Sequence, residues 1–216
     1  MTVRRFTGWA CCLLLIQGCA VHDDGAVKAD RVHASTSGTY LHSPELAFSI
    51  TVQQPWQIQV KDARLLDQQQ ISPKQSVPAR ISQSSEPLLV VSIPDGKTRV
   101  PPTIQVNYQK NAAAEQADPV ALLEQQLFYL RAAYQQFSYL TEPVRVHTHA
   151  HAAACAQFET QSDIEINGEL QEDLVMMKFC LIPRGDLMFM IAMAADTQLF
   201  PTYLPSFDAM LESVRL

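Results

Sequence analysis

The chain has 216 residues, of which 47% are hydrophobic, so it is long enough and apolar enough to form a core of ordinary size. Its 16 Lys and Arg residues against 22 Asp and Glu residues give a formal net charge of −6 at pH 7. An acidic chain of this kind lacks the basic surface that binds nucleic acid, and anionic lipid surfaces repel it. We therefore expect no nucleic-acid partner.

The first 18 residues have the pattern of a secretory signal peptide. Arg4 and Arg5 precede a short apolar run, and Gly18 is a small residue at the expected cleavage point. The segment Leu14–Cys19 resembles the bacterial lipobox, and this resemblance implies cleavage after Gly18 and lipidation of Cys19. The apolar run is too short for a transmembrane helix, which needs about 20 residues. A plain secretory signal with a free Cys19 is the alternative.

The lipobox resemblance also implies where the mature protein resides. Ala20 follows Cys19, and in the Gram-negative lipoprotein pattern this implies sorting to the outer membrane, with the protein facing the periplasm. Each buried CH₂ group contributes about 0.8 kcal/mol, so the two or more acyl chains of a lipoprotein would hold it stably on the membrane. Cleavage removes Arg4 and Arg5 and no acidic residue, which changes the net charge from −6 to −8.

Composition divides the mature chain into a tether and one domain. Residues 19–42 are small and polar without a hydrophobic period, which is typical of a flexible tether. The folded domain is expected to span residues 43–216. Its first half shows the alternation and the short apolar runs that strands have. Strands are expected at Phe48–Val52, Gln57–Val60, Leu88–Ile93 and Thr103–Tyr108, with a turn at Asp95-Gly96. Residues 67–87 are expected to form a long loop, with at most a short edge strand at Val77–Ile81.

The second half begins with a long helix. Asp118 suits the N-cap position and Pro119 suits the first helical position. Apolar residues then recur at steps of three and four as far as Phe137, and Glu142-Pro143 is expected to end the element. Three strands in succession and a last helix with Pro205 in its first turn should follow. Their ranges are Ala154–Ile166, Glu169–Ile182, Leu187–Ala195 and Thr202–Ser213.

This order of elements resembles the PsbP-like and DcrB-like proteins over about residues 46–216. The matching features are Phe48-x-Ile50-x-Val52 followed by Pro55-Trp56, the single mid-chain helix, the hairpin at Gly168, the apolar strand Met188–Ala195, and the closing Phe207, Met210, Leu211, Ser213 and Val214. The resemblance implies an α+β fold, in which an antiparallel sheet of six to eight strands has helices packed on its faces, as in a PsbP-like α/β/α sandwich. It implies no catalytic residue, because the family shares none.

Cys155 and Cys180 are the two cysteines that remain after Cys19 is lipidated and the signal is removed. Asn167-Gly168 is a strong signal for a two-residue hairpin turn, which makes Ile166 and Glu169 the first opposed pair. Eleven steps from that pair bring Cys155 opposite Cys180, in a non-hydrogen-bonded pair with Cα atoms about 4.5 Å apart. An oxidising compartment would then allow a disulfide. The alternative is two buried reduced cysteines, and a β-bulge would shift the pairing.

The segment His147-Thr148-His149-Ala150-His151 is a candidate metal site. In one extended segment, alternate side chains share a face, so the three imidazoles would line up and suit Zn²⁺ or Cu²⁺. Three ligands on a straight strand reach one ion only if the segment bends. The alternative is a solvated connection between helix and strand that tolerates histidine. We therefore expect no cofactor, with Zn²⁺ or Cu²⁺ at these histidines as the possible exception.

Signatures of enzymes are missing from the sequence. It contains no Gly-x-Ser-x-Gly, no His-Glu-x-x-His and no glycine-rich phosphate loop. Carboxylates gather around the expected hairpin tip, but their spacing is not that of a calcium-binding EF-hand loop, and a solvated acidic tip is the plainer interpretation. These residues are Asp163, Glu165, Glu169, Glu172 and Asp173.

The sequence therefore predicts a non-enzymatic, lipid-anchored accessory protein of the cell envelope. We expect it to contact the membrane through its anchor and to bind another envelope protein or a small ligand, in a role in assembly, stability or defence. A periplasmic metal-binding lipoprotein that uses His147, His149 and His151 is the first alternative. A hydrolase without a recognisable motif is the second.

Overall fold

The structure is a computed structural model that describes residues 38–67, 87–94, 100–134, 136–148, 151–166 and 169–216. At residue 133 and at residues 162–166 and 169–172 it describes the backbone alone. The edge strand expected at Val77–Ile81 and the turn expected at Asp95-Gly96 lie outside the described residues.

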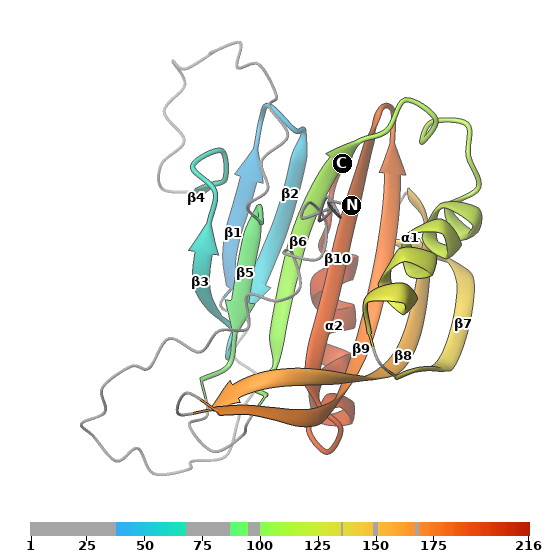
Figure 1. The fold of residues 1–216 in the computed structure, drawn as a ribbon. Helices are drawn as coiled ribbons and strands as arrows, with labels where there is room; N and C mark the ends of the chain where they lie inside the picture. The colour runs from blue at the N-terminus through green and yellow to red at the C-terminus, as the bar shows by residue number, and fades with distance from the viewer. Residues whose placement is uncertain (1–37, 68–86, 95–99, 135, 149–150, 167–168) are drawn as a thin grey trace, which may run out of the picture.

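The centre of the fold is a seven-stranded sheet in which every neighbouring pair of strands is antiparallel (Figure 1). This confirms the expected antiparallel sheet of six to eight strands. The alternating and apolar segments of the sequence supply it. In spatial order the strands are β3 (Gln57–Lys61), β5 (Leu89–Ser92), β6 (Thr103–Lys110), β10 (Leu187–Asp196), β9 (Glu169–Arg184), β8 (His151–Ile166) and β7 (Phe137–Thr148). Strand β6 buries every second side chain, whereas β10 is buried along almost its whole length.

A second, three-stranded sheet was not expected from the sequence. Its order is β2 (Phe48–Gln53), β1 (Gly38–Ser43) and β4 (Leu66–Asp67). Strand β1 begins inside residues 19–42, the range that was expected to be a tether. It does so because it pairs with β2 along its whole length and buries Leu41 completely, so residues 38–42 belong to the folded domain.

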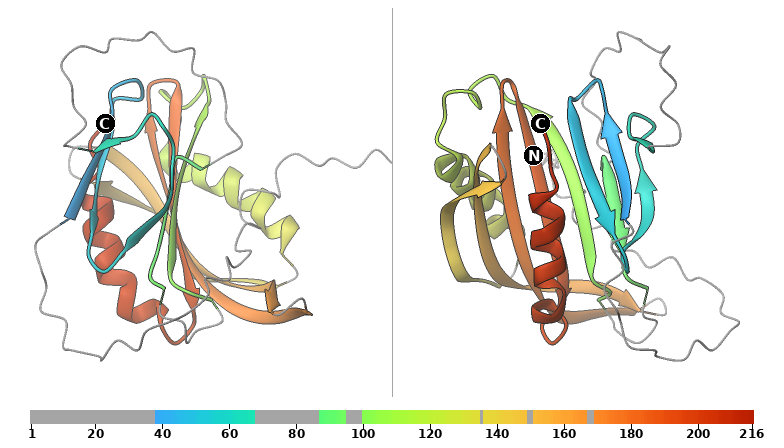
Figure 2. Two further views of the ribbon diagram at one scale, coloured as in Figure 1. Left: turned by 90° about the vertical axis from the view of Figure 1, so that its left-hand side faces the viewer. Right: turned by 180° about the vertical axis from the view of Figure 1, so that it is seen from behind.

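Helices cover both faces of the seven-stranded sheet, as expected. Helix α1 (Pro119–Ala133) packs on one face, over β7, β8 and β9 (Figure 1). Helix α2 (Phe200–Glu212) and the three-stranded sheet lie on the other face, as the side view in Figure 2 shows. We call these two sides the α1 face and the α2 face.

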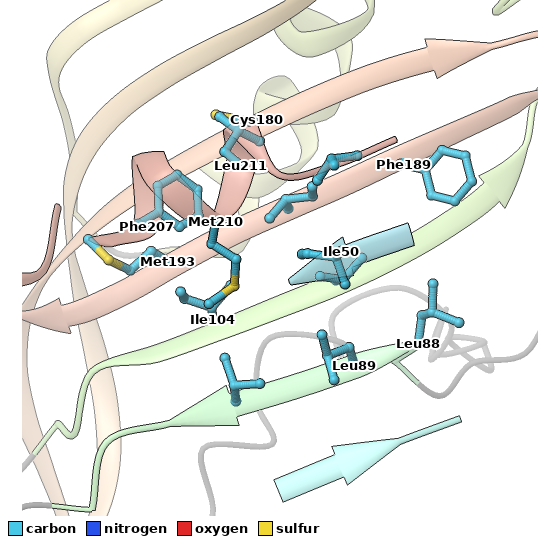
Figure 3. Close-up of a cluster of buried hydrophobic side chains, with 14 of the residues drawn as sticks. Ile50, Leu88, Leu89, Ile104, Cys180, Phe189, Met193, Phe207, Met210 and Leu211 are labelled. Atoms are coloured by element: carbon cyan, nitrogen blue, oxygen red, sulfur yellow. The ribbon is translucent and has the colours of Figure 1, made fainter. Parts of the chain in front are cut away.

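Strict alternation along the strands builds a separate core on each face. On the α2 face, Phe189 of β10 stacks on Phe48 of β2 with ring centroids 5.0 Å apart, and this contact joins the two sheets. Figure 3 shows how Ile104, Met193, Phe207 and Met210 converge in the same core. On the α1 face, Leu123 and Leu127 of α1 pack over residues such as Phe158 and Phe179. Full burial of one such side chain contributes about 1.5–3 kcal/mol.

Helix α1 is shorter than the sequence suggests. Asp118 is the N-cap as expected, and its side chain accepts a hydrogen bond from the Val120 backbone N–H. The helix ends at Ala133, however, and Phe137 begins strand β7, so four strands follow the helix where three were expected. Phe137 buries its ring better from the strand, where it stacks on Phe158 at 4.5 Å.

Helix α2 is longer at its start than expected. It begins at Phe200, where Thr202 was expected, so Pro205 lies inside the helix and not in its first turn. The missing N–H of Pro205 removes one hydrogen bond from the helix. Burial of Phe200, Phe207, Met210 and Leu211 against the α2 face offsets that loss.

Strands β8 and β9 run on beyond their neighbours as a two-stranded ribbon (Figure 1, in orange). The pairing of β7 with β8 stops at Thr160, and the pairing of β10 with β9 stops at Val175. From Ser162 to Ile166 and from Glu169 to Asp173 the two strands therefore pair only with each other, among the residues that the structure describes. We call these two segments the β8–β9 ribbon.

Candidate functional site

The disulfide between Cys155 and Cys180 is formed in the structure, with the sulfur atoms 2.03 Å apart. The register expected from the Asn167-Gly168 turn holds without a bulge from Ile166–Glu169 to Ala154–Leu181. The two Cα atoms are 4.1 Å apart, close to the spacing of a non-hydrogen-bonded pair. Both residues are buried on the α2 face. The cystine therefore joins β8 to β9 inside the core.

His147 and His151 lie on two different strands and not on the one straight strand that the metal hypothesis assumed. Strand β7 ends at Thr148 and β8 begins at His151, so the chain reverses between His147 and His151. His149 lies outside the described residues.

The β7–β8 register separates the two described histidines. His147 pairs with Ala152, whereas Thr148 pairs with His151. Opposed residues share a face and consecutive residues alternate, so His147 belongs to the α1 face and His151 to the α2 face. Within the described part of the chain, no group of three or more His, Cys, Asp and Glu side chains is placed to hold a metal ion. This register gives the metal hypothesis no support.

An open cavity of about 500 Å³ lies at the end of the sheet, beside the turns. Residues 114–119, which precede and begin α1, form one wall, and Arg145, Ala152, Pro183 and Gly185 form the other. Gly185 has a φ of +54°, a left-handed conformation that favours glycine and allows the tight β9–β10 turn. The cavity was not expected, because its wall includes Arg145 of the unexpected strand β7.

The charges around this cavity are largely paired with each other. The guanidinium of Arg145 donates a hydrogen bond of 2.8 Å to the Asp118 carboxylate, which also caps α1. Both side chains are about half exposed, so water screens the pair and its contribution to stability is small. The lining of the site offers hydrogen-bonding groups that a small polar molecule could contact. It lacks, among the described residues, a nucleophile that is hydrogen-bonded to a base.

A second charged cluster has a structural role. Asp62 accepts hydrogen bonds from the side chain and the backbone N–H of Arg64, whose guanidinium also donates to the Tyr108 hydroxyl and lies 5.2 Å from the centre of that ring. The side-chain hydrogen bond from Arg64 lowers the pKa of Asp62, and the same contact raises the pKa of Arg64. These interactions fasten the segment after β3 to β6.

Exposed aromatic residues mark the outer side of α1. Phe128 is 71% exposed and Tyr129 is 58% exposed, and their rings meet edge to face at 5.7 Å. They fall on the helix side opposite the apolar stripe that faces the sheet, so the hydrophobic spacing does not point to them. The available signal is that two adjacent aromatic residues lie outside that stripe.

None of the described helices has the length and apolar character that crossing a membrane requires.

No protein-family model matches the sequence, and no curated protein matches it. Several solved structures have a similar arrangement. CyanoP, the PsbP of the cyanobacterium Synechocystis sp. PCC 6803, aligns with a TM-score of 0.47 and 8% identity over 87% of this chain and 98% of its own. LpqN of Mycobacterium tuberculosis, described as involved in cell envelope biogenesis, aligns with a TM-score of 0.48 and 16% identity over 82% of this chain and 89% of its own.

A third similar structure is PA94 of Pseudomonas aeruginosa, a protein of unknown function. It has a TM-score of 0.42 and 13% identity, over 82% of this chain and 96% of its own. At these identities and TM-scores the likeness concerns the arrangement of strands and helices, and no activity is transferred to this chain.

Proposed function

We propose that this protein is a lipid-anchored, non-enzymatic accessory protein of the cell envelope that binds another envelope protein or a small ligand. The Cys155–Cys180 disulfide is the observation that carries the proposal. Disulfides persist in oxidising compartments such as the bacterial periplasm and are rare in the cytosol. The signal-like residues 1–18, at the other end of the chain, favour export independently.

The anchor would be Cys19, and the length of chain that follows suits a tether. Eighteen residues separate Cys19 from Gly38, where β1 begins. Fully extended, they span at most about 60 Å. That reach is several times the Debye length of about 8 Å at physiological ionic strength, so the acidic domain is able to stay clear of an anionic surface. Ala20 after Cys19 favours the outer membrane, facing the periplasm.

The groups in the end cavity favour binding over catalysis. Asp118 and Arg145 neutralise each other there, and both are half exposed to water. Catalytic groups usually have strongly shifted pKa values in a water-excluded site, and this cavity is open. A polar ligand or the edge of a partner protein fits such a place better than a reaction does.

Cell fractionation and intact-mass analysis of the full chain in a Gram-negative host test the proposal. The mature protein should begin at an acylated Cys19 and fractionate with the outer membrane. Cys19→Ala should give uncleaved or soluble protein, whereas the matched control Cys12→Ala, a cysteine inside the signal segment, should behave as the wild type does. Cleavage elsewhere without acyl mass would refute the anchor.

A further inference from the structure

The outer side of α1 is nearly uncharged and has no neighbour among the described elements (Figures 1 and 2). The helix contains two charged residues, Glu124 and Arg131, and their opposite charges cancel. The exposed stripe along its middle consists of Ala121, Gln125, Phe128 and Ala132, with Tyr129 beside it. We call Phe128 and Tyr129 the aromatic pair. Covering these two rings would remove apolar area from water, which is favourable.

The area of the aromatic pair is too small for a stable interface between two copies of the chain. An aromatic side chain buries about 150–250 Å², so two rings that are 71% and 58% exposed offer roughly 250 Å². A specific protein interface needs about 800 Å² on each partner. Contact with a lipid bilayer needs no matching surface, and aromatic rings settle readily at its interface.

The length of the tether brings the aromatic pair within reach of a bilayer. A compact domain of the size of residues 38–216 has a diameter of roughly 40 Å. The segment between Cys19 and Gly38 spans at most about 60 Å, more than that diameter, so the anchor permits any face of the domain to meet the membrane. The surface itself therefore decides which face does so. A short tether also gives an effective concentration in the millimolar range, at which a weak contact is populated.

We propose that the aromatic pair is a second membrane contact, which lays the α1 side of the domain on the lipid surface to which Cys19 is anchored. The proposal rests on the proposed function in one respect, the lipid anchor. The bilayer interface is what covers the aromatic pair. The opposite charges of Glu124 and Arg131 leave no net charge beside the rings that would oppose the contact, and screening weakens repulsion from charges farther away. The α2 face stays free for a partner.

Fluorescence of the full chain on vesicles of phosphatidylcholine and phosphatidylethanolamine tests the proposal. Tyr129→Trp places a reporter in the aromatic pair, and Leu140→Trp places one on β7, where the native side chain is similarly exposed at 51%. Lipids brominated in the acyl chain should quench the Tyr129→Trp reporter at least twofold more than the Leu140→Trp reporter. Adding Phe128→Ser to Tyr129→Trp should remove that difference, whereas adding Val144→Ser should not. Circular dichroism confirms that each variant is folded.

Several results would overturn the proposal. Equal quenching of the two reporters would show that the domain has no preferred face toward the bilayer. A change from dimer to monomer on Phe128→Ser would show that a second copy covers the aromatic pair. To separate the contact from the anchor, the Cys19→Ala chain is also held on chelating lipid through an N-terminal hexahistidine tag. If the twofold difference in quenching persists with the tagged chain while the protein is not acylated in cells, the anchor is refuted and the membrane contact is supported. If the tagged chain shows no difference in quenching, the membrane contact itself is refuted.

Discussion

Loss of the Cys155–Cys180 disulfide should lower the stability of the domain substantially. The cystine joins residues 25 apart in the sequence, so its removal gives the unfolded chain back the entropy of a loop of that length. The chain-entropy relation gives about 3.5 kcal/mol for such a loop. For a domain of this size, 1 kcal/mol changes the melting temperature by about 2–4 °C, so the expected decrease is about 10 °C.

Thermal unfolding of the full chain, with and without reductant, measures this decrease. The double variant Cys155→Ala/Cys180→Ala should reproduce it and lose somewhat more, because the buried sulfur atoms also pack in the core. Reductant should have no further effect on the double variant, which serves as the control. The reasoning fails if both thiols are alkylated before reduction. It also fails if complete reduction changes the melting temperature by less than about 2 °C.

Three smaller effects follow from the same structure. Asp118→Ala should cost about 1 kcal/mol in chemical denaturation because α1 loses its N-cap, whereas Asp118→Asn should retain most of that stability. Arg64 lowers the pKa of Asp62, so the ionised carboxylate stabilises the folded protein above the unfolded pKa. This stabilisation is lost as the pH falls through the folded pKa. In Asp62→Asn the free energy of unfolding should therefore fall less steeply below pH 3.8 than it does in the wild type. Saturating Zn²⁺ should change the melting temperature equally in the wild type, His147→Ala and His151→Ala. If either substitution abolishes a Zn²⁺-induced change, the two imidazoles are not separated as the β7–β8 register indicates.

The β8–β9 hairpin could be predicted in register because its turn is local and chemically distinct. Asn167-Gly168 fixes the first opposed pair, and every later pair follows by counting unless a bulge intervenes. The structure confirms the whole ladder, including Phe158 opposite Met177 and Cys155 opposite Cys180. A single strong turn signal was therefore enough to predict a disulfide.

Strand β7 could not be predicted in the same way. Phe137 continues the helical spacing of Leu130 and Tyr134, yet it also alternates with Tyr139, so its local pattern fits a helix and a strand equally. Pairing with β8 decides in favour of the strand, and that contact is tertiary. Register shifts between Tyr139 and Val144, an exposed edge and Pro143 then hide the alternation that an inner strand shows.

The candidate sites also differ in whether a local sequence signal marks them or only a tertiary contact creates them. The histidine hypothesis assumed one extended segment, since His149-Ala150 carries none of the turn residues that mark a reversal. The sequence therefore gives no sign that the chain reverses between His147 and His151, and its spacing places both on one face. The pairing of β7 with β8 places them on opposite faces. The end cavity needs Arg145 of β7 beside the loop before α1, and no local pattern reports that approach.

The β8–β9 ribbon has a consequence for how the protein behaves when crowded. Both outer edges of the ribbon are without a neighbouring strand among the described residues, and such edges template association between identical chains. Half of the ten residues in the two segments are acidic and none is basic. Pairing of two ribbons would bring ten acidic residues together, so copies of the protein repel each other at this ribbon at neutral pH. Acidification removes that repulsion, which makes the ribbon the place where aggregation of this protein should begin.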